Sequence, residues 1–285
     1  MDIFPLLGSR VEEKGIGRAL VLSLESPRAD LMEEKIKELV DRDIQEHGRS
    51  TILSLQSPVL TDLTVTQSEE EYTSKATPLI WAACLGRTTL VEFFLSRGAD
   101  INATDSHNRT ALIWAADRGD LKTTLCLIKH GADLEIKENR YLSTALNWAA
   151  WRGRPGVVKA LVEAGAVIDT LNIFGHPAIE LGLRVNGTKT DDDNSFKITE
   201  ILLKAGAQLP QRHKALLKRL KYIENHFSFA NLFVQHGATV DETMFDQIRA
   251  KMGEEKENQL RAALSHKVPY TCNAFEPIVY VFFRN

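Results

Sequence analysis

The chain has 285 residues and a formal net charge of −3, with 44% hydrophobic and 26% charged residues. These values are typical of soluble globular proteins and exclude a wholly disordered, collagen-like or low-complexity chain. No apolar run approaches the roughly 20 residues that span a bilayer, and no basic stretch leads into a long apolar core near the first residue. We therefore expect no membrane span and no classical secretion signal.

The cysteine content points to a reducing compartment. The chain has three cysteines, Cys84, Cys126 and Cys272. They show no paired spacing, so they predict neither a disulfide framework nor a zinc site. We expect a cytoplasmic protein, with the nucleus as an alternative and delivery into a host cell as a further one if the source is bacterial.

Residues 1–76 form an acidic N-terminal flank, with nine Lys/Arg against fifteen Asp/Glu. Within it, apolar residues recur at helical spacing over 27–47, and Gly48 follows directly. This pattern predicts one amphipathic helix that ends at the glycine. Residues 49–76 are rich in Ser, Thr and Glu, and they read as a polar linker.

An internal repeat begins at Thr77. The segment Thr77–Ala83 has the pattern Thr-x-Leu-x-Trp-Ala-Ala, and the same pattern recurs at Thr110–Ala116 and Thr144–Ala150. The three starts are 33 and 34 residues apart. A second signature closes each unit with a Gly-Ala pair, and its glycines have the same spacing. These glycines are Gly98, Gly131 and Gly165. Two independent markers with one period indicate stacked structural repeats.

The residue types fit a pair of helices in each repeat. A threonine at the start suits an N-cap, because its hydroxyl accepts a hydrogen bond from a free backbone amide. Pro78 suits the first helical position, where no amide is needed. The Ala-Ala pair lets helices approach closely, and the closing glycines suit a left-handed C-cap.

These motifs and their period resemble the ankyrin-repeat family. The chain departs from the family's opening at the histidine position, where Ile80, Ile113 and Asn147 stand. The resemblance implies an all-α solenoid of stacked helix-turn-helix units joined by β-hairpin-like loops, with helical caps at both ends. It also implies a non-enzymatic adaptor that binds a partner protein on its concave face and hairpin tips, with a monomer as the expected state.

The repeats are predicted to fill residues 77–240 in five units, of which three are clear. The fourth carries an insertion at 187–195, and the fifth is degenerate and ends at Gly237-Ala238. Residues 241–285 are predicted to form a helical C-terminal cap and tail, with one helix over 254–266.

The resemblance places candidate partner-binding residues on the hairpin tips and after each Ala-Ala pair. They are His107, Arg109, Asp117, Arg118, Arg140, Tyr141, Trp151, Arg152 and Phe174. Tyr, Trp and Arg are the residue types most enriched among interface hot spots. The repeated tryptophans Trp81, Trp114 and Trp148 lie inside the helix signature, so we assign them to packing rather than to base stacking.

Residues 212–221 raise a second hypothesis, binding to phosphate or another anionic surface. Five basic residues lie in this stretch without an acid: Arg212, Lys214, Lys218, Arg219 and Lys221. A solvated face of an ordinary amphipathic helix explains the cluster equally simply. Nucleic acid is not the expected partner of the whole chain, because its net charge is negative.

A third hypothesis is an enzyme, or a host-directed bacterial effector, whose activity lies in the flanks and whose repeats select the substrate. Cys272 with His266 is its only candidate pair, and no known local signature surrounds them. We predict no catalytic residues and no cofactor. We predict no metal site either, because the run Asp191–Asp193 lacks the spaced ligands and turn glycine of a calcium loop.

Overall fold

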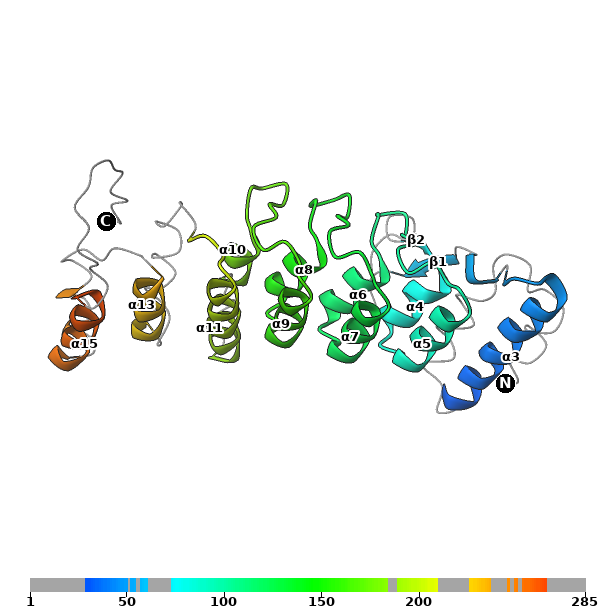
Figure 1. The fold of residues 1–285 in the computed structure, drawn as a ribbon, viewed down its shortest axis with the longest axis horizontal. Helices are drawn as coiled ribbons and strands as arrows, with labels where there is room; N and C mark the ends of the chain where they lie inside the picture. The colour runs from blue at the N-terminus through cyan, green and yellow to red at the C-terminus, as the bar shows by residue number, and fades with distance from the viewer. Residues whose placement is uncertain are drawn as a thin grey trace.

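Figure 1 shows the chain as a computed structural model in which helices follow one another along a single axis. The structure describes residues 29–50, 52–54, 57–60, 73–183, 189–209, 226–236, 245–246, 249–250 and 253–265.

The stack has two rows of helices. The first helix of each repeat belongs to one row: α4 (Pro78–Cys84), α6 (Ala111–Arg118), α8 (Ala145–Trp151) and α10 (Ala178–Gly182). The second helices form the other row: α5 (Thr88–Ser96), α7 (Leu121–Lys129), α9 (Pro155–Glu163) and α11 (Lys189–Lys204). Each helix packs against its partner and against the next helix of its own row, and the hairpin loops project beside the first row (Figure 1). The predicted all-α solenoid of stacked helix pairs is confirmed.

The capping residues act as the sequence predicted. The side chains of Thr77, Thr110 and Thr144 each accept a hydrogen bond from the backbone amide three residues later, at 3.3–3.4 Å. Gly98 and Gly165 follow the second helices with φ of 86° and 90°, a conformation that costs any other residue strain. The repeat boundaries are therefore set by local backbone chemistry.

The core lies between the two rows. Trp81 and Trp114 are 3% and 7% exposed, as expected for packing residues. The Ala-Ala pairs are buried throughout, which lets neighbouring first helices lie close together. Leu125, Leu127 and Ile128 are apolar residues at helical spacing, which predicts that they form the buried stripe of a second helix. For Leu125 this prediction is wrong. Leu125 is 49% exposed, and Cys126 is buried in its place.

The hairpin loops are linked to one another in a row. The amide of Asn139 donates to the carbonyl of His107 at 2.9 Å, and the amide of Ile173 donates to the carbonyl of Tyr141 at 2.7 Å. Since each bond joins one loop to the next, the backbones of consecutive loop tips are held in register with each other.

The N-terminal flank contains helix α3 (Ala29–His47), which lies within the range 27–47 predicted for one helix. Residues 49–76 were expected to be a polar linker. They contain a short 3-10 helix, η1 (Ile52–Ser54), and an antiparallel strand pair, β1 (Ser57–Leu60) and β2 (Thr73–Ala76). The strands escaped prediction because neither shows the alternation of apolar and polar residues that marks a strand. β2 leads directly into the first repeat, and α3 contributes Ile36 and Val40 to the core.

At the other end, the predicted insertion at 187–195 is largely helical. α11 begins at Lys189 and takes up most of it. The sequence pattern predicts the closing helix of this unit only over residues 198–204. A run of aspartates at the start of a helix is favoured by the positive end of the helix dipole. Beyond it lie α13 (His226–Gln235) and α15 (Glu254–Ser265), which contact each other.

Candidate functional site

The first predicted binding residues, on the loop at 104–109, are engaged within the chain. The guanidinium of Arg109 pairs with Asp105 at 3.0 Å and lies 3.9 Å from the centroid of the Trp114 ring. The Asp105 carboxylate also accepts a hydrogen bond from Trp114 Nε1 at 3.2 Å. His107 is half-buried and joins the loop row through its carbonyl. Arg109 therefore stabilises its own repeat, a role that the sequence did not predict.

Asp117 and Arg152 form an ion pair between successive repeats. Arg152 Nε donates to Asp117 Oδ1 at 2.5 Å, and its guanidinium carbon lies 4.5 Å from the centroid of Trp151. The Arg152 side chain is 44% exposed. Arg118, one position after Asp117, is exposed at the end of α6. Arg118 and Arg152 thus lie at the surface, whereas Cys84 and Leu85, the positions after the first Ala-Ala pair, pack partly against the core.

Four aromatic side chains gather beside this pair, two from α8 and one from each of the hairpin loops that precede α8 and α10. Tyr141 lies 6.0 Å from Trp148 and 6.2 Å from Phe174, measured between ring centroids. Trp148 lies 5.2 Å from Trp151 with its ring nearly perpendicular. Edge-to-face contacts of this kind are favourable beyond the burial of area. Three predicted residues, Tyr141, Trp151 and Phe174, are thereby brought together.

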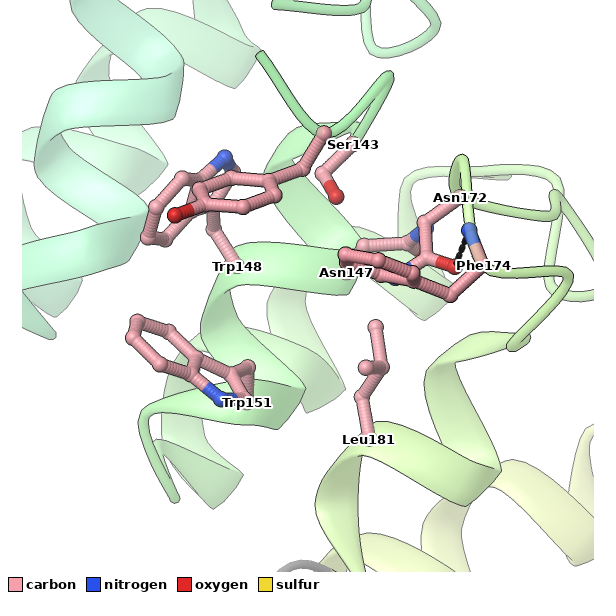
Figure 2. A pocket seen from close by; sticks show the side chains of 8 residues that line it. Ser143, Asn147, Trp148, Trp151, Asn172, Phe174 and Leu181 are labelled. Carbon is pink, nitrogen blue, oxygen red and sulfur yellow. Dashed lines mark hydrogen bonds between the residues drawn. The ribbon is translucent and has the colours of Figure 1, made fainter.

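These rings line a pocket of about 270 Å³, which we call the aromatic pocket (Figure 2). Its lining residues are Tyr141, Ser143, Asn147, Trp148, Trp151, Asn172, Phe174 and Leu181. They come from the hairpin loops at 137–143 and 171–174 and from helices α8 and α10. None of them carries a charge.

Local hydrogen bonds hold the two loops that frame the pocket. The buried Glu138 carboxylate accepts from the amides of Arg140 and Tyr141, both at 2.7 Å. Asn172 Oδ1 accepts from the amide of Phe174 at 3.0 Å, the dashed bond in Figure 2. Leu142 has a φ of 53°, an uncommon value for a branched side chain. The backbone of each loop is thus held by a buried side chain of the same loop, Glu138 or Asn172, while Leu142 and Phe174 are exposed.

The rim of the pocket is apolar and exposed. Phe174 is 58% exposed and Trp151 is 39% exposed. Further exposed apolar side chains on the same two loops are Leu142, Leu171 and Ile173. Adjacent exposed apolar residues of this size mark interaction surfaces more often than scattered ones do.

Two buried polar atoms at the pocket lack a hydrogen-bond partner. Asn147 is fully buried, and its Nδ2 donates to the carbonyl of Thr170 at 3.2 Å, but its Oδ1 has no partner. Trp148 Nε1 is likewise unpaired. Sequence reasoning missed both as site residues. The sequence does single out Asn147, because this polar residue stands where the two preceding repeats have Ile80 and Ile113.

The remaining sequence candidates are not placed by the structure. The basic residues at 212–221 and the pair His266 and Cys272 lie outside the described residues. Burial raises the pKa of the Cys84 thiol to about 11, so this cysteine stays protonated near neutral pH. Within the described ranges, no group of three or more His, Cys, Asp or Glu is placed to hold a metal ion. No described helix is both long and apolar enough to cross a membrane.

Comparison with known proteins agrees with the fold. The family model for ankyrin repeats (3 copies) matches residues 34–138 and 79–172, so the match begins inside α3. The chain is 41% identical over 75 residues to the palmitoyltransferase AKR1 of Candida glabrata, which is 26% of this chain and 10% of that protein. It is 37% identical over 76 residues to the human neurogenic locus notch homolog protein 2, covering 27% of this chain and 3% of that protein.

The chain matches the ankyrin repeat and KH domain-containing protein CBG24701 of Caenorhabditis briggsae over a longer segment. There the identity is 31% over 192 residues, which cover 58% of this chain and 7% of that protein. The chain thus spans a tenth or less of these relatives. What is shared is the repeat region, and it leaves most of each relative unmatched.

Proposed function

The chain is an ankyrin-repeat protein, and on that premise we propose that it is a protein-interaction module whose third and fourth repeats bind a partner protein. The observation that carries the proposal is the aromatic pocket with its exposed apolar rim. Interface energy concentrates in a few aromatic and Arg anchors at well-packed positions. The aromatic residues and Arg152 supply such anchors side by side.

We propose two kinds of contribution from the nine candidate residues. Tyr141, Trp151, Arg152 and Phe174 contact the partner directly, because they surround the pocket or its rim. Arg140, whose guanidinium lies 5.2 Å from the Tyr141 ring, joins them at the edge. Rim charges of this kind affect the association rate and salt dependence more than the affinity.

The remaining candidates act at the border of the surface or through their neighbours. Asp117 positions Arg152 through their ion pair, and Arg109 stabilises its own loop through its ion pair with Asp105. His107 and Arg118 extend the surface toward the first repeats. The bonded row of loops supports this assignment, since the loop backbones are already ordered before binding, which lowers the ordering cost.

The similarity to a palmitoyltransferase does not support a catalytic function for this chain. The similarity covers 75 residues and 10% of that protein, and these residues are repeats. Ankyrin-repeat domains are generally non-enzymatic, and a fold alone does not establish an activity.

A capture experiment with matched variants tests the proposal. The full chain with Trp151→Ala and Arg152→Ala should lose its captured partner from a cell extract while its circular dichroism stays unchanged. Leu125→Ala is the control, because Leu125 is 49% exposed on the second-helix row, away from the pocket. Retention of the same partner by the double variant would refute the assigned surface.

A further inference from the structure

The size of the aromatic pocket limits what it can hold. Small-molecule sites in proteins occupy roughly 300–1,000 Å³. At about 270 Å³, this pocket lies just below that range. The volume suits a single large side chain rather than a dinucleotide-sized cofactor. If the proposed function holds, the occupant is therefore one anchoring side chain of the partner.

The surroundings favour an uncharged occupant. No lining residue is charged. The nearby carboxylates of Asp117 and Glu180 are engaged, one with Arg152 and the other with His176. The Glu138 carboxylate is likewise bound by backbone amides. A charged side chain in the pocket would lose its hydration without gaining an unpaired opposite charge, which is unfavourable. The aromatic walls instead complement a neutral ring.

The buried amide of Asn147 adds a directional requirement. Ile80 and Ile113 fill the equivalent positions in the two preceding repeats, where they are fully buried. Packing at this position therefore needs no polar group. The Asn147 Oδ1 atom, by contrast, is a buried acceptor without a donor. A buried acceptor without a partner destabilises the free protein. A ligand that donates a hydrogen bond to this acceptor removes that cost.

We propose that the aromatic pocket accepts one neutral aromatic side chain with a hydrogen-bond donor, a tyrosine or tryptophan of the partner, which donates to Asn147 Oδ1. The ring packs against Trp151 and Phe174, both partly exposed before binding. Phe174 is the wall that turns to admit it, because it lies on a loop and is 58% exposed.

The test uses three small probes and the full chain labelled with nitrogen-15. The probes are N-acetyl-tyrosinamide, N-acetyl-phenylalaninamide and tetramethylammonium. Titrations follow the indole signals of Trp148 and Trp151 and the side-chain amide signals of Asn147. Tyrosinamide should bind about 3- to 10-fold more tightly than phenylalaninamide, the range that one neutral hydrogen bond gives.

The variant Asn147→Ile provides the matched control, since isoleucine already occupies positions 80 and 113. This variant should bind both aromatic probes equally, at the affinity that phenylalaninamide has for the unmodified chain. Trp151→Ala should weaken both. These two results separate the hydrogen bond from the general apolar contact.

Three results would overturn the inference. Equal affinity of the two aromatic probes for the unmodified chain would remove the role of Asn147. Tighter binding of tetramethylammonium would identify a cation cage instead. No change in the Trp148 and Trp151 signals with any probe would show that the pocket takes no ligand. In that last case the proposed function still stands if the Trp151→Ala and Arg152→Ala variant loses its captured partner.

Discussion

Arg152 reaches back one repeat to Asp117, and its guanidinium lies between that carboxylate and the ring of Trp151. A second donor, Nη2, bonds the other carboxylate oxygen at 3.4 Å. The pair links α8 to α6 at the edge of the aromatic pocket. One residue of the proposed binding surface is thereby positioned by the preceding repeat.

The first prediction concerns this pair. Asp117→Asn should lower the free energy of unfolding by less than about 1 kcal/mol, because partly exposed ion pairs contribute little. A double-mutant cycle with Arg152→Gln, measured by urea unfolding, should give a coupling energy in the same range. The coupling should shrink in 1 M salt. A coupling energy several times larger would show that the pair is a major stabilising contact.

The second prediction concerns the N-caps. Thr144→Ala should destabilise the chain by about 1 kcal/mol, because the amide of Asn147 loses its hydrogen bond at the start of α8. Thr144→Ser keeps the hydroxyl and should cost less than half of that. Urea unfolding of the two variants checks both values. Equal losses would mean that the methyl group, and not the cap, is what matters.

The third prediction compares two helical glycines. A Cβ atom on Gly182 would lie 2.6 Å from Ile198 Cγ2, so Gly182→Ala should destabilise by about 1–3 kcal/mol through overpacking. A Cβ atom on Gly156 would meet only Leu121 Cδ2, at 3.6 Å. Gly156→Ala should therefore stabilise by up to about 1 kcal/mol through helix propensity.

Thermal unfolding of the two glycine variants measures the difference. Opposite shifts in melting temperature are expected. If Gly182→Ala also raised the melting temperature, the close approach of α10 and α11 would not limit the packing of the fourth repeat.

The fourth prediction concerns pH and Glu257 in α15. Its carboxylate is 1% exposed and accepts hydrogen bonds from Arg249 and Arg261, which hold the pKa of Glu257 below its usual value, about 4.3. A carboxyl whose pKa is lowered by folding stabilises the fold above its unfolded pKa. That stabilisation is lost as the pH falls through the folded pKa.

Glu257→Gln should therefore be less stable than the unmodified chain at pH 7, and the difference should shrink below about pH 4. Urea unfolding across the pH range 3–7 measures it. A constant difference would mean that the charge of Glu257 is not what stabilises this end of the chain.

Much of the fold was predictable because the repeat is defined by local chemistry. Thr110 caps a helix and Gly131 ends one through contacts within a few residues, and both are visible in the sequence. The strand pair β1–β2 was not predictable, because its pairing joins residues 57–60 to 73–76 without a hydrophobic alternation. Leu125 was misassigned since an apolar residue at helical spacing can still face solvent.

The candidate site was predictable only in part. Tyr141, Trp151 and Phe174 were selected by residue type and position, and the structure places them around one pocket. The pocket itself depends on how far α8 and α10 lie apart, and a sequence does not give that separation. The engagement of Arg109 with Asp105 and Trp114 likewise required the folded loop.

Site-specific photo-crosslinking tests the central claim most directly. A benzophenone side chain is placed at position 174 in one variant of the full chain and at position 125 in another. Both positions are exposed, at 58% and 49%, but position 174 lies on a hairpin loop and position 125 lies on α7 in the second-helix row. The account predicts that the partner protein is crosslinked from position 174 and not from position 125. Crosslinking from 125 alone, or equally from both, would contradict it.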